Sequence, residues 1–146
     1  MSIIGIDYGD KRIGVAITDE LTGSAHPLKV IPNSIGIREI KKLAADYGNV
    51  EKLVVGMPYN LKSEVAFKAK QVFRWIEKLK KEVNIPVETW DERFSTSEAK
   101  SILLGADVSR KKRKEVIDKM AACIILQSYV DAQEKGARSE EVQKGI

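Results

Sequence analysis

The chain has 146 residues, of which 43% are hydrophobic and 32% charged, and its formal net charge is +4. This composition excludes a mainly disordered chain. No stretch reaches the roughly 18 apolar residues of a membrane span, and the N-terminus has no signal-peptide pattern. The single cysteine, Cys123, excludes an internal disulfide framework and fits a reducing compartment, so we expect a cytoplasmic protein. The length fits one globular domain, and the mild basic excess permits a polyanionic partner.

The hydrophobic pattern predicts strands that alternate with helices. Five segments have the pattern of strands: 2–8, 12–18, 25–31, 52–55 and 85–90. Four segments have helical spacing: 34–47, 63–82, 96–104 and 115–134. Pro27 indicates that the third strand is an edge strand or begins late. In the second helix the predicted apolar stripe includes Val72, Phe73 and Ile76.

This order of elements predicts a mixed α/β sheet in one domain, residues 1–135, followed by a polar tail, 136–146. Helical crossovers join the third strand to the fourth and the fourth to the fifth. If the fourth strand pairs parallel with the first, the carboxyl ends of strands one, four and five lie at one edge of the sheet. We expect the functional site at that edge.

Acidic residues follow these strand ends. Asp7 closes the first apolar strand, Asp91 and Glu92 come directly after the fifth, and Asp118 lies in the first turn of the last predicted helix. Each also has an ordinary structural explanation, as a turn cap, an exposed loop acid or an acid near a helix N-terminus. Carboxylates from separate segments suit Mg²⁺ or Mn²⁺, which support phosphodiester cleavage. One His and one Cys supply too few ligands for a typical zinc site.

Cationic residues lie near the same segments. Arg12 follows the first turn and Arg93 adjoins Glu92. Five consecutive basic residues precede the last helix: Arg110, Lys111, Lys112, Arg113 and Lys114. Such groups would neutralise nucleic-acid phosphates without reading sequence, although charged loops are often only solvated. After Gly56-Met-Pro58, Tyr59 and Asn60 could contact a base or sugar, or form a plain turn.

Four stretches together resemble the YqgF family of ribonuclease H-like nucleases, also called RuvX or Holliday-junction-resolvase-like proteins. They are Ile6-Asp-Tyr-Gly-Asp-Lys-Arg-Ile-Gly-Val-Ala16, Val54-Val-Gly-Met-Pro58, Asp91-Glu-Arg-Phe-Ser-Thr96 and Asp118-Lys-Met-Ala-Ala-Cys-Ile-Ile-Leu126. The resemblance implies a three-layer ribonuclease H-like fold with sheet order 3-2-1-4-5. It also implies an acidic site of Asp7, Asp118 and either Glu92 or Asp91. The family is associated with 5′-end processing of the 16S ribosomal RNA precursor in ribosome biogenesis, and by analogy with cleavage of branched DNA.

The chain departs from many ribonuclease H-like enzymes at the fourth strand, where Gly56-Met-Pro58 replaces an expected acid. The missing carboxylate must therefore come from Asp91 or Glu92. We expect a metal-dependent nuclease, monomeric or homodimeric, that acts on RNA rather than branched DNA, in or near pre-ribosomal particles. Three alternatives stay open: a Holliday-junction-type DNA resolvase, a non-catalytic RNA-binding assembly factor and an actin-like ATPase. The last is considered because Ile6-Asp-Tyr-Gly-Asp10 also resembles the first phosphate motif of actin-like ATPases.

Overall fold

The computed structural model describes residues 1–58, 63–92 and 120–134. Several predicted site residues lie outside these ranges: Tyr59, Asn60, Arg93, Arg110, Lys111, Lys112, Arg113, Lys114 and Asp118. The predicted helix over 96–104 and the polar tail also lie outside them. None of the helices within the described ranges has the length and apolar character needed to cross a bilayer.

The described elements alternate as the sequence predicts. In chain order they are β1 (Ser2–Asp7), β2 (Arg12–Thr18), β3 (Ala25–Pro32), the short 3₁₀ helix η1 (Asn33–Ile35), α1 (Gly36–Tyr47), β4 (Val50–Met57), α2 (Ser63–Glu82) and β5 (Val87–Asp91). Residues 120–134 form the last described helix. Gly48 ends α1 in the left-handed conformation, with φ of 68°, as expected for a glycine stop.

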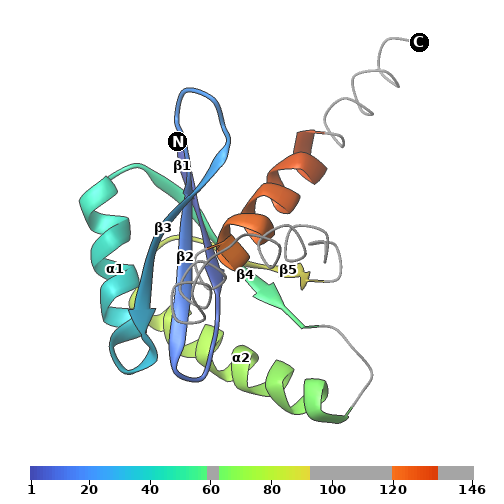
Figure 1. The fold of residues 1–146 in the computed structure, drawn as a ribbon. Helices are drawn as coiled ribbons and strands as arrows, with labels where there is room; N and C mark the ends of the chain where they lie inside the picture. Colours follow the sequence, from blue (N-terminus) through green and yellow to red (C-terminus); the bar gives the residue numbers. More distant parts are fainter. Residues whose placement is uncertain (59–62, 93–119, 135–146) are drawn as a thin grey trace, which may run out of the picture.

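The sheet has five strands in the order β3-β2-β1-β4-β5, which confirms the predicted order. β1, β2 and β3 pair antiparallel, whereas β4 pairs parallel with both β1 and β5. β3 is an edge strand, so Pro27 lies where a missing N–H donor is tolerated. Figure 1 shows α1 and α2 on one face of the sheet and helix 120–134 on the other, giving three layers.

β4 and β5 differ most from the predicted strands. β4 runs from Val50 to Met57 rather than over 52–55, because Gly56 and Met57 continue the parallel ladder beside Trp90 and Asp91. A glycine lacks a packing side chain but keeps both backbone hydrogen-bonding groups, so it does not end the strand. β5 begins at Val87 rather than 85, although the carbonyl of Pro86 still accepts a hydrogen bond from the Leu53 N–H at 2.9 Å.

Two apolar clusters hold the layers together. Ile4, Ile6 and Met57 are fully buried in the cluster that includes residues of α1 and α2. On the other face, Leu126 packs so closely on β1 that a Cβ added at Gly5 would lie 2.6 Å from the Leu126 Cβ. Helix 120–134 therefore lies directly on the centre of the sheet.

Cys123 belongs to this second cluster and is buried. Its thiol donates a hydrogen bond to the carbonyl of Ala25, with an Sγ–O distance of 3.3 Å. Burial raises the pKa of the Cys123 thiol. Because only the thiolate is a good nucleophile, this cysteine has a packing role.

A partly buried polar network fastens helix 120–134 to β4 and β5. The Lys52 ammonium donates to Tyr129 Oη at 3.0 Å and to Glu88 Oε1 at 3.2 Å. The Tyr129 hydroxyl donates to Glu88 Oε2 at 2.6 Å, and the Trp90 indole N–H donates to Ser128 Oγ at 3.0 Å. The Trp90 ring also meets the Tyr129 ring edge-on, with centroids 5.5 Å apart. These contacts fix the position of the helix along the sheet.

Tyr129→Phe should lower the free energy of unfolding by about 1–2 kcal/mol at pH 7, since it removes hydrogen bonds to two charged groups. The pKa of Glu88 is lowered from 4.5, first because the Tyr129 hydroxyl donates a hydrogen bond to its carboxylate. The ionised Glu88 therefore stabilises the fold above pH 4.5, and this stabilisation is lost as the pH falls through the lowered pKa. The pKa of Lys52 is raised from 10.5, first by its bond to Tyr129, so its stabilisation is lost only at more alkaline pH.

Urea unfolding of wild type and Tyr129→Phe between pH 3 and pH 9 measures this difference. The gap in unfolding free energy should be constant across neutral pH and should shrink in acid. Tyr47→Phe is a matched control, because Tyr47 lies at the exposed end of α1. A gap that is already absent at pH 7 would show that the network does not stabilise the fold.

Candidate active site

Three parallel strands end at one edge of the sheet, where the sequence places its acidic residues. Asp7 is the last residue of β1, and the preceding Ile6 lies beside Val55 of β4. In the same ladder, Gly56 lies beside Trp90 and Met57 beside Asp91. The predicted common edge is therefore present.

Asp7 lies on the face of the sheet that helix 120–134 covers. Gly5 faces this helix, because an added Cβ there would meet Leu126. Side chains of a strand alternate between faces, so Asp7, two residues further on, shares the face of Gly5. Arg12 lies on the same face, because Asp7 pairs with Gly14 and Arg12 is two residues from Gly14 in β2.

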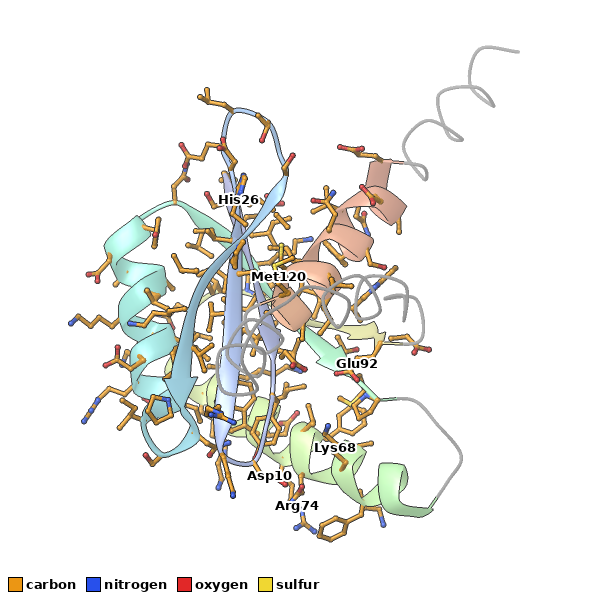
Figure 2. The ribbon with its side chains drawn as sticks, viewed as in Figure 1. Asp10, His26, Lys68, Arg74, Glu92 and Met120 are labelled. Atoms are coloured by element: carbon orange, nitrogen blue, oxygen red, sulfur yellow. The ribbon has the colours of Figure 1, made fainter. Side chains whose placement is uncertain are left out.

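Asp91 and Glu92 lie on different faces. Asp91 pairs with Met57, whose side chain is fully buried in the cluster on the α1–α2 face. Neighbouring residues in a ladder share a face, so Asp91 points away from helix 120–134. Glu92, by contrast, lies against Gly56: its Oε1 is 3.1 Å and its Cγ 3.2 Å from the position of an added Gly56 Cβ. Figure 2 labels Glu92 beside the ends of β4 and β5.

Gly56 makes the space that Glu92 occupies. The same added Cβ would lie 2.5 Å from Ile125 Cδ1, so Gly56 is also covered by helix 120–134. Any larger residue at this position would compete with both side chains for the same volume. The carboxylate of Glu92 thus lies over the end of β4, where the sequence lacks an acid.

Asp7 and Glu92 share a face and an edge, whereas Asp91 does not share their face. Within residues 1–58, 63–92 and 120–134, no group of three acidic, histidine or cysteine side chains is placed to hold a metal ion. Asp118, the third predicted acid, is outside those ranges. Asp7, Arg12, Asp91 and Glu92 all take part in interactions with other groups.

Asp91 and Glu92 are alternatives in the sequence, because pairing in the β4–β5 ladder decides which one faces helix 120–134. The network of Lys52, Glu88 and Tyr129 was not predicted. The signal that could have found the network is the polar Glu88 within a short strand, opposite a predicted helix that carries a tyrosine on its apolar face.

Thermus thermophilus RuvC and a fowlpox virus Holliday junction resolvase are solved structures with a similar arrangement of elements. Thermus thermophilus RuvC, solved in complex with a Holliday junction substrate, is 16% identical, with a TM-score of 0.58 over 92% of this chain and 96% of that chain. The fowlpox virus Holliday junction resolvase is 12% identical, with a TM-score of 0.51 over 90% of this chain and 99% of that chain. The fold is therefore that of the RuvC-like ribonuclease H proteins.

The family model described as RuvX, Holliday junction resolvase, matches residues 1–132, and the chain belongs to this family. A relative from Desulforamulus reducens is 47% identical over 135 residues, which are 90% of this chain and 98% of the relative. One from Halothermothrix orenii is 48% identical over 138 residues, 92% of this chain and 98% of the relative. Both carry the name "Putative pre-16S rRNA nuclease". The predicted family resemblance is confirmed.

Proposed function

We propose that this chain is a metal-dependent nuclease that hydrolyses phosphodiester bonds in the 5′-end processing of the 16S ribosomal RNA precursor, in the cytoplasm. The observation that carries the proposal is the placement of Asp7 and Glu92 on one face at the carboxyl edge of the sheet. The names of relatives that are 47% and 48% identical over nearly their whole length support RNA as the substrate.

Asp7, Glu92 and Asp118 are the proposed ligands of Mg²⁺ or Mn²⁺. Carboxylate oxygens are the donors that these cations prefer, and two carboxylates brought to one edge favour a cation that offsets their repulsion. Asp118 precedes the buried Ala122 by four residues in the sequence. Asp91 is left out of the set because its ladder partner Met57 places it on the other face. When bound, such ions supply an activated water and stabilise the leaving oxygen.

The proposed phosphate contacts surround these acids. Arg12 shares the face of Asp7, and a guanidinium group can donate two parallel hydrogen bonds to one phosphate. Arg93, next to Glu92 in sequence, and the basic run of residues 110–114 extend the same role. A base or sugar of the RNA would contact Tyr59 and Asn60, which follow Pro58 in the sequence.

Cleavage of two matched substrates tests this function. A precursor RNA that spans the 5′ end of 16S rRNA and a four-way-junction DNA would each be incubated with Mg²⁺, with Mn²⁺ and with EDTA. We expect RNA cleavage that requires the divalent ion. Cleavage of the junction alone would instead favour a resolvase, a reading supported by the family description and the RuvC-like fold. Metal-independent RNA binding without cleavage would favour the non-catalytic assembly factor.

Gly56→Ala should slow cleavage about ten- to hundredfold with only a small loss of stability. The added methyl displaces Ile125 Cδ1, the flexible end of a side chain, but also presses on Glu92 at 3.1–3.2 Å. A misplacement of catalytic groups by less than 1 Å is enough for such a loss of rate. The cleavage rate and the free energy of unfolding would be measured together.

Gly23→Ala is the matched control for this variant. Gly23 has a φ of 74°, and an added Cβ there meets nothing within 4 Å. The control should therefore lose about 1 kcal/mol of stability through backbone strain alone, with no effect on rate. Equal rates for Gly56→Ala and Gly23→Ala would show that the position of Glu92 does not matter for cleavage.

A further inference from the structure

A groove runs between α1 and α2. Two adjoining hollows of about 290 and 460 Å³ form it, and both are lined by Ile37, Arg38 and Lys78. Figure 1 shows both helices on the face of the sheet opposite helix 120–134. The groove is therefore separate from the face that carries Asp7 and Glu92.

The sides of the groove are cationic. Arg38 and Lys41 line it from α1, and Lys78 and Lys81 line it from α2. Glu82 is the only acid among its lining residues, all of which belong to the described ranges, and its Oε2 lies 3.7 Å from Lys41 Nζ. On each helix the two cations are three residues apart, so they recur on one side of the helix.

The floor of the groove is apolar. Ile35, Ile37 and Trp75 contribute to it, and the Trp75 ring is held against Tyr8 with centroids 5.1 Å apart. An apolar floor between two cationic sides suits single-stranded nucleic acid, since phosphates pair with the cations while ribose and base cover the floor. A purely acidic peptide would match the cations but would leave the apolar floor without a complementary group.

We propose that the groove between α1 and α2 binds a single-stranded RNA segment at a distance from the cleavage edge. This inference rests on the proposed function, because it takes the groove's ligand to be a second part of the same precursor RNA. Binding at the groove would tether a long substrate and raise its effective concentration at the edge. Short RNAs that cannot reach both faces would gain nothing from it.

The test compares Arg38→Gln/Lys78→Gln with Lys42→Gln/Lys80→Gln. Both double variants lose two positive charges from α1 and α2, but Lys42 and Lys80 do not line the groove. All four residues are exposed, so the fold should survive. Affinity for a labelled single-stranded RNA would be measured by fluorescence anisotropy in EDTA, over a series of salt concentrations.

We expect the slope of log affinity against log salt to fall by about 1.4 in the groove variant, since each phosphate contact on a single strand contributes about 0.7. At 0.1 M salt this corresponds to roughly 25-fold weaker binding. The control variant should keep the wild-type slope. Equal slopes in the two variants would overturn the proposal, and so would a groove that binds an oligoglutamate peptide but not RNA.

Because RNA affinity is measured in EDTA, without a divalent ion, the result for the groove does not depend on the proposed nuclease activity. A fall in slope confined to the groove variant, in a protein that cleaves no RNA when Mg²⁺ is restored, would remove the nuclease proposal and retain the groove. Metal-dependent cleavage together with equal slopes would remove the groove and retain the nuclease.

Discussion

Asp7→Asn should reduce Mg²⁺-dependent cleavage about a thousandfold and leave the fold intact. The substitution removes a charged ligand from the proposed metal site, where stabilisation of several kcal/mol is at stake, and each 1.36 kcal/mol is about tenfold in rate. Asn has nearly the shape of Asp, so the backbone pairing of β1 with Gly14 of β2 should persist. Single-turnover cleavage rates and thermal unfolding of the two proteins measure both effects.

Asp10→Asn is the matched control for Asp7→Asn. Asp10 lies in the exposed turn between β1 and β2, three residues along the same hairpin, and is labelled in Figure 2. Its replacement changes the net charge equally but should leave the rate within about twofold, because water and salt screen an exposed charge. An Asp7→Asn protein as active as the control would remove the catalytic proposal. RNA binding that survives in the variant, with no cleavage in wild type, would favour the assembly factor.

Glu92→Gln should slow cleavage about a hundredfold or more, whereas Asp91→Asn should change the rate by less than about threefold. Glu92 lies over Gly56 on the face covered by helix 120–134, and Asp91 lies beside Met57 on the other face. Removal of one electrostatic group from a catalytic site costs about 10²–10³ in rate. The adjacent acids change charge equally when replaced, so each variant is the control for the other.

Cleavage rates at saturating Mg²⁺, and the Mg²⁺ concentration that gives half the maximal rate, would be measured for both variants. Glu92→Gln should also require more Mg²⁺. The opposite order of effects would mean that the metal lies on the α1–α2 face of the sheet. Equal, small effects would mean that neither carboxylate is a ligand.

The order of the strands could be predicted from the sequence because it follows from simple rules. The antiparallel hairpins of β1, β2 and β3 have short turns, and each crossover to β4 and β5 contains a helix. Pro27 indicated an edge strand because proline has no N–H group to donate to a neighbouring strand. These are local signals that tertiary packing did not override.

The side-chain faces were harder to predict. Phe73, expected on the apolar stripe of α2, is 44% exposed, whereas Val72 and Ile76 are buried. Successive helical residues are about 100° apart, so Phe73 lies at the margin of the stripe that Val72 and Ile76 define. Similarly, the role of Gly56 depends on close packing between β4 and helix 120–134, which brings together residues far apart in sequence.

The cationic groove also escaped prediction. Arg38 and Lys78 are 40 positions apart and each looks like an ordinary solvated residue on the polar side of an amphipathic helix. Only the packing of α1 against α2 brings both to the same two hollows. The basic run at 110–114 could be recognised in the sequence because its charges are consecutive.

The most direct test of the proposed site is a crystal structure of the protein grown with Mn²⁺ and measured near the manganese absorption edge. The account predicts an anomalous peak at the carboxyl edge of the sheet, within coordination distance of carboxylate oxygens of both Asp7 and Glu92. A manganese ion bound by Asp91 on the opposite face, or no ion at this edge at saturating Mn²⁺, would contradict it.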